Sequence, residues 1–248
     1  MNEPRIHVDQ DLRADQATTL GKDVRHYAGN VLRLGAGDFL RLFNGRDGEW
    51  RAEIIGMERS ALTVQPVEQT RLQRTEPDLW LLFAPIKGKR IDAIAEKAGE
   101  LGAAEIRPVI TRRTVVSRVN TERLQANARE AAEQCERLSL PTVQEPEALE
   151  KVLANWPAGR RLLFADERGG ARPIGEALIA AATEPATPWA VLIGPEGGFE
   201  DAEKDLIRAL PDALPVSLGP RLLRADTAAF ATLALWQAHL GDWQTGDI

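Results

Sequence analysis

The sequence contains very little cysteine and histidine. Its only cysteine, Cys135, cannot form an internal disulfide, which is typical of proteins from a reducing compartment. The three histidines, His7, His26 and His239, are far apart and show no metal-ligand spacing. A zinc site of the Cys/His type is therefore not expected, and the sequence predicts no metal.

Long apolar runs are also missing. No stretch approaches the roughly 18 consecutive apolar residues of a membrane span. The first residues, MNEPRIHVDQ, carry charges but no apolar segment of the kind found in signal peptides. Glycine (20) and proline (15) are too few for a disordered or collagen-like chain of 248 residues. We therefore expect a globular cytoplasmic protein without membrane contact.

The first part of the chain, residues 4–73, is predicted to be rich in short strands. Alternating runs at 39–43 and 49–55 flank a four-residue turn that ends in Asp-Gly, which is a typical hairpin signal. A further strand is expected at 61–67, and Pro66 places it towards a sheet edge. Five or six short strands in this segment predict a small β-barrel.

From residue 78 onwards, apolar runs alternate with helical patterns. The expected strands lie at 79–84, 106–110, 162–165, 190–193 and 214–218. The expected helices lie at 90–101, 121–138, 173–182, 201–210 and 227–240. This alternation predicts an α/β fold with a mostly parallel sheet covered on both faces. A polar linker, LQRTE at 72–76, separates the expected domains 1–73 and 77–248.

A glycine-rich loop, within AVLIGPEGGFEDAE at 190–203, carries the first specific signal. A buried strand ends there, a Gly-Pro turn follows, and an acidic helix begins. Gly194, Gly197 and Gly198 would let the backbone adopt positive φ and approach a ligand closely. The acidic first turn disfavours a nucleotide triphosphate and tolerates a cationic cofactor. A plain strand-to-helix turn is the structural alternative.

A second loop, SLGPRLLRADT at 217–227, repeats the order of strand, Gly-Pro and helix. Leu222 and Leu223 could line an apolar slot while Arg221 and Arg224 reach anionic or planar polar groups. The alternative is a helix start with solvated arginines. Since ligands of α/β sheets bind at the carboxyl ends of strands, the two loops together predict a ligand site.

These loops carry a resemblance to a known family. GPEGG at 194–198, followed by LGPRLLRADTAA at 218–229, resembles the signature of the bacterial 16S rRNA (uracil 1498, N3)-methyltransferases of the SPOUT superfamily. Similar segments are FNG at 43–45, KAGELG at 97–102 and EQCER at 133–137 with Pro141. The chain departs from the family at Ala225-Asp226, where many members have Thr-Glu, and at Glu136, where many have glycine.

The resemblance implies a SPOUT catalytic domain with a deep C-terminal trefoil knot, an N-terminal PUA/OB-like RNA-binding β-barrel, and a homodimer. It also implies S-adenosyl-L-methionine as cofactor, with no metal. Carried over residue by residue, the cofactor pocket would comprise Ala165, Asp166, Glu167, Gly194, Pro195, Glu196, Gly197, Gly198, Leu218, Gly219, Leu222, Leu223 and Arg224. Leu218 and Leu223 would sandwich the adenine, and Gly194 and Gly197 would leave room for the bent cofactor.

The implied reaction is methylation of N3 of a uridine in 16S rRNA of the small ribosomal subunit. N3 becomes nucleophilic once its imide proton leaves and the charge on O2 or O4 is stabilised. We expect Arg224, and then Arg221, to supply that stabilisation. Glu196 or Asp226 would take the proton, the alternative for Glu196 being a loop carboxylate that holds main-chain N–H groups.

RNA contacts must come from local patches, because 31 Lys and Arg residues face 37 acidic ones and the net charge is −6. Two segments, at 86–90 and 107–118, contain basic residues and no acid. They provide the candidate RNA-binding residues Lys87, Lys89, Arg90, Arg112 and Arg113. A GC-rich genome that favours arginine codons is the alternative explanation for the abundance of arginine.

Two other functions remain open at this point. The chain could be a catalytically silent RNA-binding or ribosome-assembly factor on the same scaffold, or a SPOUT methyltransferase for another RNA position. An ordinary Rossmann methyltransferase is not expected, because no glycine-rich loop follows the first strand of the α/β half.

Overall fold

The computed structural model describes residues 3–116, 118–166, 170–183 and 187–244. The chain divides into two compact units, of which the first comprises the chain up to residue 75 together with 132–140, and the second comprises the remainder. Segment 132–140 thus belongs to the N-terminal unit, although residues of the other unit flank it in sequence. Within the described ranges, no helix is long and apolar enough to cross a membrane.

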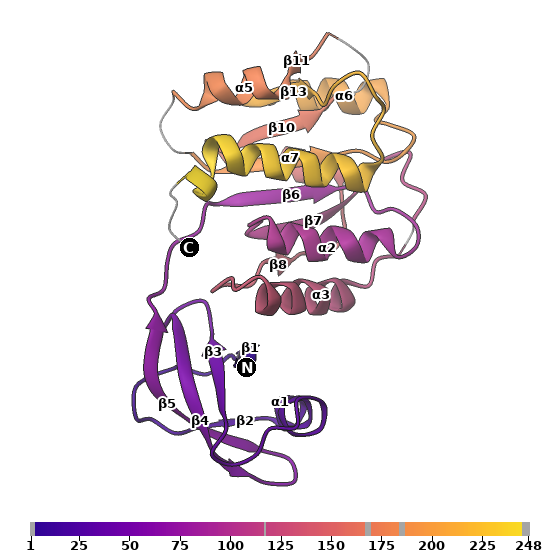
Figure 1. Cartoon of the computed structure of the whole chain (residues 1–248). Coiled ribbons are helices and arrows are strands. Elements are labelled where there is room, and N and C mark those ends of the chain that lie inside the picture. The colour runs from indigo at the N-terminus through magenta and orange to yellow at the C-terminus, as the bar shows by residue number, and fades with distance from the viewer. Residues whose placement is uncertain (1–2, 117, 167–169, 184–186, 245–248) are drawn as a thin grey trace. The chain divides into compact units, whose positions relative to one another are not determined.

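The N-terminal unit is built on a five-stranded sheet (Figure 1). Its strands are β1 (Arg5–His7), β2 (Thr18–Leu20), β3 (Phe39–Phe43), β4 (Glu49–Met57) and β5 (Leu62–Arg71), paired in the order β1-β3-β4-β5-β2. Alternate residues such as Leu40, Leu42 and Ile54 are buried in one apolar core. The helix α1 (Lys22–His26), which continues as a π-helix over Tyr27–Val31, adds Ala28 to that core.

Pro66 lies inside this sheet, which corrects the expected edge position. β5 is flanked by β4 and β2, but β2 pairs only with residues 62–64. The register of β4 against β5 shifts beside Pro66, so that Ala52 faces Pro66 while Arg51 faces Glu68. The missing N–H of proline therefore falls at a bulge beyond the end of β2, where no ladder hydrogen bond is lost.

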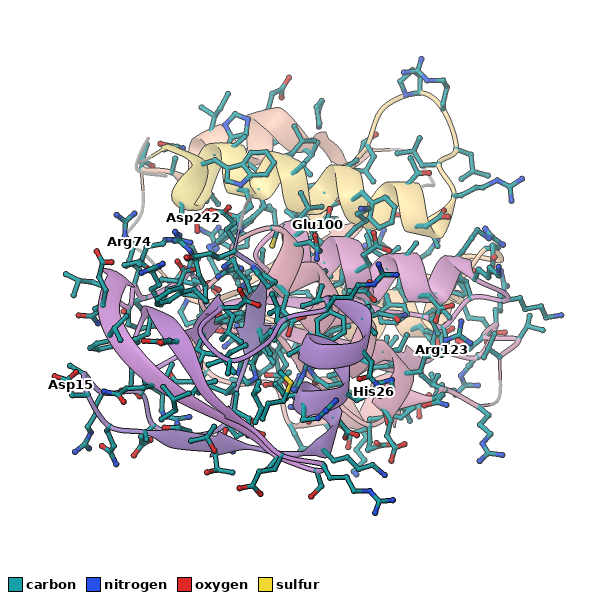
Figure 2. All side chains as sticks on the ribbon, turned by 60° about the horizontal axis from the view of Figure 1, so that its bottom comes forward. Asp15, His26, Arg74, Glu100, Arg123 and Asp242 are labelled. Carbon is teal, nitrogen blue, oxygen red and sulfur yellow. The ribbon has the colours of Figure 1, made fainter. Side chains whose placement is uncertain are left out.

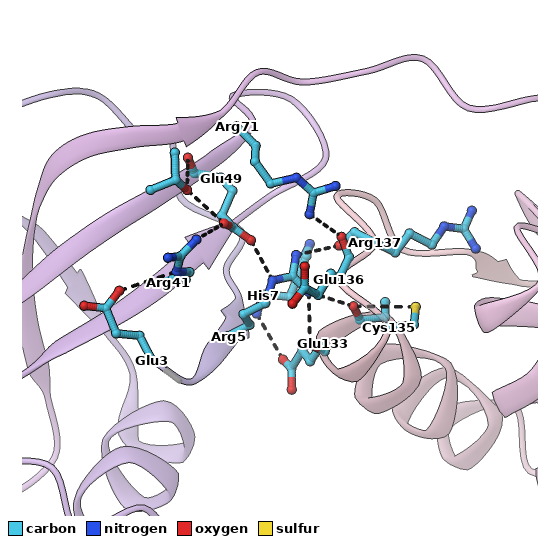
Figure 3. A network of polar contacts seen from close by, with 12 residues as sticks. Glu3, Arg5, His7, Arg41, Glu49, Arg71, Glu133, Cys135, Glu136 and Arg137 are labelled. Atoms are coloured by element: carbon cyan, nitrogen blue, oxygen red, sulfur yellow. Dashed lines mark hydrogen bonds and ion pairs between the residues drawn. The ribbon is translucent and has the colours of Figure 1, made fainter. Parts of the chain in front are cut away.

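A buried carboxylate, Glu49, organises the polar contacts of the N-terminal unit (Figure 3). It accepts hydrogen bonds from Arg5 Nε at 2.6 Å, Arg41 Nη1 at 2.9 Å and Thr70 Oγ1 at 2.8 Å. Burial alone would raise the pKa of Glu49, but the three donors outweigh it and hold the pKa below its usual value. The carboxylate thus stays charged and joins β1, β3 and β5.

The same unit caps the end of α3 (Thr121–Gln134). Arg5 donates to the main-chain carbonyls of Ala132, Glu133 and Arg137. Arg71 donates to the carbonyl of Glu136 at 2.6 Å. Carbonyls at a helix C-terminus have no partner inside the helix, so the arginines satisfy groups that would otherwise need water. These contacts anchor segment 132–140 to the N-terminal sheet.

Glu136 has a left-handed backbone conformation, with φ of 62°. A residue with a Cβ is strained there, and this is a position where the chain departs from the glycine common in the family it resembles. The conformation also explains why α3 ends at Gln134, four residues before the predicted end.

We predict that Glu136→Gly raises the free energy of unfolding by about 0.5–1 kcal/mol, because the strain disappears while the carbonyl that binds Arg71 remains. Urea denaturation would measure the change. The matched control is Glu130→Gly inside α3, which should lower the free energy of unfolding by about 1 kcal/mol. A loss of stability in both variants would contradict the prediction.

The second unit contains a parallel sheet, as predicted. Its longer strands are β6 (Leu79–Phe83), β7 (Glu105–Ile110), β10 (Arg161–Ala165), β12 (Trp189–Ile193) and β13 (Ala213–Ser217), in the order β13-β10-β12-β6-β7. The short strands β11 (Arg172–Pro173), β8 (Thr142–Val143) and β9 (Glu147–Ala148) extend it at its two ends. All of these strand pairs are parallel.

Helices cover both faces of this sheet (Figure 1). Alternate side chains such as Leu81 and Val191 belong to a core shared with α2 (Arg90–Glu100), α3, α5 (Ile174–Ala181) and α7 (Ala225–Leu240). Their neighbours Leu82 and Leu192 belong to a core shared with α4 (Leu149–Ala154) and α6 (Asp201–Arg208). The strands are apolar on both sides, as central strands of a parallel sheet must be.

Candidate cofactor site

Three loops meet at one edge of the second unit's sheet. β13, β10 and β12 are parallel neighbours, so the chain leaves each of them at the same edge. The loops enclose a cavity of about 770 Å³, a size suited to a small organic ligand. Its walls are Ala165 and Asp166, residues 193–199, residues 216–225, and the helical residues Lys204 and Ala228.

The residues that the resemblance assigned to the cofactor converge here. Twelve of the thirteen line the cavity, and the remaining one, Glu167, lies outside the described residues. Of the candidate catalytic residues, Arg221, Arg224 and Glu196 also line the cavity, whereas Asp226 does not. Sequence reasoning did not find Phe199, Lys204 or Ala228, which stand in ordinary helical or apolar patterns.

The glycines of the first loop have different structural roles. Gly198 has a left-handed conformation, with φ of 68°, but Gly194 and Gly197 do not, which corrects the expectation for those two. A Cβ at Gly194 would lie 2.9 Å from the ring of Phe199, and one at Gly197 would lie 3.4 Å from Arg113 Cδ. Gly194 is therefore required by the packing of a buried phenylalanine under the loop.

The loop is held in place by the start of α6. Glu203, which is 2% exposed, accepts hydrogen bonds from the main-chain N–H of Glu200 at 2.9 Å and of Arg112 at 2.8 Å. Arg113 Nη1 donates to the carbonyl of Gly197 at 2.9 Å. The segment after β7 is thus attached both to α6 and to the glycine loop. Glu203 stabilises the helix N-terminus as part of a capping box.

The second loop presents apolar and basic side chains separately. Leu218 and Leu223 are half-buried against the core, while Leu222 is 78% exposed. All three leucines line the cavity, with Leu218 and Leu223 packed against the core and Leu222 largely exposed. Arg221 and Arg224 are exposed, and among the described residues their guanidinium groups have no hydrogen bond or ion pair.

The candidate RNA-binding residues follow the two adjoining strands. Lys87, Lys89 and Arg90 come after β6, and Arg112 and Arg113 come after β7, so all five lie at the same edge of the sheet as the cavity. Arg90 Nη2 forms an ion pair with Glu196 Oε1 at 3.1 Å. Arg112 pairs with Glu150 at 2.9 Å, and this hydrogen bond raises the pKa of Arg112. Among the described residues, Lys87 and Lys89 have no such partner.

The titratable side chains of His26 and Arg123 lie outside the cavity and have partners of their own. His26 is exposed on α1 of the N-terminal unit (Figure 2), and its Nδ1 is 3.0 Å from Asn30 Nδ2. Arg123 on α3 pairs with Asp92. In the part of the chain that the structure describes, no group of three or more His, Cys, Asp or Glu residues could hold a metal ion.

A family model described as an RNA methyltransferase domain matches residues 74–237, and a second, an RNA methyltransferase PUA domain, matches residues 20–67. The chain belongs to this RNA methyltransferase family. The first match includes all of the described cavity residues. The predicted family membership, the α/β fold of the SPOUT type and the PUA-like N-terminal unit are therefore confirmed.

Known members of the RNA methyltransferase family resemble the chain over nearly its whole length. Ribosomal RNA small subunit methyltransferase E of Rickettsia conorii is 33% identical, over 93% of this chain and 93% of its own. The protein of that name in Synechocystis is 35% identical, over 95% of this chain and 78% of its own. The chain thus shares a full-length architecture with these enzymes.

Solved structures resemble this chain over nearly its whole length as well. A methyltransferase from Legionella pneumophila, in complex with the bound cofactor SAM, is 30% identical with a TM-score of 0.84 and covers 98% of this chain and 100% of that one. A small subunit methyltransferase E from Neisseria gonorrhoeae is 24% identical with a TM-score of 0.87 and the same coverage, which supports the fold.

Proposed function

We propose that the protein methylates N3 of a uridine in 16S rRNA of the small ribosomal subunit, with S-adenosyl-L-methionine as methyl donor. The observation that carries the proposal is the cavity at the carboxyl edge of β13, β10 and β12, which is lined by every described residue assigned to the cofactor. The names of the relatives support the rRNA substrate, and the SAM-bound Legionella structure supports the cofactor.

The residues of the cavity fit this cofactor. Leu218 and Leu223 offer two apolar surfaces suited to a flat adenine ring, and the main chain of the three loops offers hydrogen-bonding groups for its edge. When bound, the cofactor supplies a methyl group already activated by its sulfonium.

The side chains at the cavity provide for the acceptor base. Arg224 has a guanidinium without a partner among the described residues, which we propose stabilises the charge on a uracil carbonyl as the N3 proton leaves. Arg221 would assist. Of the two candidate carboxylates, Glu196 lines the cavity and Asp226 does not, so we propose Glu196 as the proton acceptor, oriented by its ion pair with Arg90.

The decisive experiment combines a deletion strain with mass mapping of its 16S rRNA. We expect that rRNA to lack one methyl group on a single uridine, and the purified protein with methyl-labelled S-adenosyl-L-methionine to restore it, on free rRNA or assembled subunits. Fragmentation would locate the methyl group at N3. RNA binding without methyl transfer would instead identify a silent assembly factor, and a methyl group elsewhere would identify a different target.

We further propose that the cations after β6 bind the RNA backbone. Lys87→Ala together with Lys89→Ala should weaken binding of the small-subunit substrate. The slope of the logarithm of the binding constant against the logarithm of the salt concentration should become shallower by about two, because each lysine that binds a phosphate releases a counterion. Filter binding at several salt concentrations would measure both effects, and cofactor affinity should not change.

The matched control is Lys97→Ala together with Lys151→Ala, which removes the same charge from helices α2 and α4 of the same unit. This pair should bind RNA as the wild type does. Equal losses in both double variants would show a general charge effect and reject the patch. Lysines are preferable here to Arg112 and Arg113, because replacing Arg113 would also break its hydrogen bond to Gly197 in the cofactor loop.

At the level of organisation, we propose that residues 1–73 form an RNA-binding domain and residues 77–248 a knotted catalytic domain in a cytoplasmic homodimer. The match of residues 20–67 to a PUA domain supports the first. The non-sequential strand order, in which the chain passes from β12 across β10 to β13, is consistent with a knot. The sequence of α7 is apolar on all sides, yet Phe230 and Leu235 are only half-buried, which favours a partner on that helix.

A further inference from the structure

Lys204 is an unpaired charge in the wall of the cofactor cavity. The residue is 4% exposed and lies on α6, an otherwise amphipathic helix. Within the described ranges its main-chain N–H bonds the carbonyl of Glu200, and its ammonium has no hydrogen bond or ion pair. The side chain is largely buried yet lines the cavity, so a ligand in the cavity that carries an anion could form a charge-assisted hydrogen bond with this ammonium.

Two carboxylates close to Lys204, one in the cavity wall and one its neighbour in sequence, are already engaged. Asp166, which also lines the cavity, has a side chain only 2% exposed and forms an ion pair with Arg208, one helical turn beyond Lys204 on α6. Glu203 accepts main-chain hydrogen bonds from Glu200 and Arg112. Of the two cations one turn apart on α6, Arg208 has a carboxylate partner, whereas Lys204, which lines the cavity, has none among the described residues.

We propose that the Lys204 ammonium binds the carboxylate of the methionine portion of S-adenosyl-L-methionine. The inference rests on the proposed function, which places that compound in the cavity. The compound carries a sulfonium, an amine and one carboxylate, so the carboxylate is its only group with a charge opposite to that of lysine. A charge-assisted hydrogen bond there would fix the methionine end while Leu218 and Leu223 hold the ring.

Calorimetry with two compounds tests this assignment in the full-length protein. The compounds are S-adenosylhomocysteine and the same molecule without its carboxylate. Lys204→Met should weaken binding of S-adenosylhomocysteine by roughly tenfold or more and leave binding of the decarboxylated compound unchanged. Lys204→Arg should restore most of the loss, and Lys97→Met, which replaces a half-buried lysine on α2 outside the cavity, should change neither affinity.

Equal weakening of both compounds in Lys204→Met would show a structural role and overturn the inference, as would unchanged affinity for S-adenosylhomocysteine. Thermal melting of each variant checks its fold, and we expect Lys204→Met to melt close to the wild type, because among the described residues the ammonium has no hydrogen bond or ion pair to lose. Failure of the wild-type protein to bind either compound would refute the proposed function itself, which separates the two failures.

Discussion

Arg224→Ala should lower kcat by about 10²–10³-fold while leaving cofactor affinity within a factor of about two. The expected loss is large because the guanidinium would act only as charge develops on the uracil carbonyl, in a cavity partly shielded from water. The fold should survive, since Arg224 precedes α7 and its side chain has no hydrogen bond or ion pair among the described residues. Single-turnover methylation and calorimetry would measure the two effects.

The control for this variant is Arg172→Ala. Arg172 is an exposed arginine of the same unit, in the short strand β11, and its guanidinium likewise has no partner in the described part of the chain. Its replacement should leave turnover unchanged. Turnover close to that of the wild type in Arg224→Ala, with cofactor binding intact, would remove Arg224 from the mechanism and transfer the role to Arg221.

Gly48→Ala should destabilise the N-terminal unit by roughly 3–5 kcal/mol. Gly48 has a left-handed φ of 76°, and an added Cβ would lie 2.2 Å from the main-chain oxygen of Arg71 and 2.9 Å from the nitrogen of Gln73. Backbone atoms on both sides cannot yield as a flexible side chain could. Hydrogen exchange should therefore increase throughout β3, β4 and β5.

Gly37→Ala separates the steric clash from backbone strain. Gly37 also has a left-handed conformation, with φ of 89°, but a Cβ there would meet no atom within 4 Å. This variant should cost only about 1–2 kcal/mol, the strain term alone. If the two variants were equally unstable, the contact with the end of β5 would not be the cause.

The strands of the α/β half could be predicted well because each is a short run that is apolar on both faces. The sequence pattern does not predict the two-residue strands β8, β9 and β11 or the six-residue helix α4. Such short elements contain too few residues to show the periodicity of a strand or a helix. The end of α3 was misplaced because its apolar spacing continues to Leu138, whereas the backbone at Glu136 turns left-handed. Long-range contacts override local pattern at such positions.

The site could be located from the sequence because two Gly-Pro loops follow strands, and the parallel order brings them to one edge. Three features could not be read from it. The order of residues in the sequence does not show that Gly194 makes room for the ring of Phe199 or that Glu203 accepts a hydrogen bond from the main-chain N–H of Arg112. It also does not show that Lys204 lines the cavity. Each depends on a neighbour that is distant in sequence or on the exact rotation of a helix.

The assignment of residues 132–140 to the N-terminal unit has a consequence for synthesis. Because Arg5 and Arg71 bind carbonyls at 132–137, a nascent chain that has exposed only the first 75 residues still lacks part of its first folded body. That body can close only after residue 140 has left the ribosomal tunnel, by which time β6, α2 and β7 of the second unit have also emerged. The first folded body is therefore completed while the second is being synthesised, rather than before the second begins.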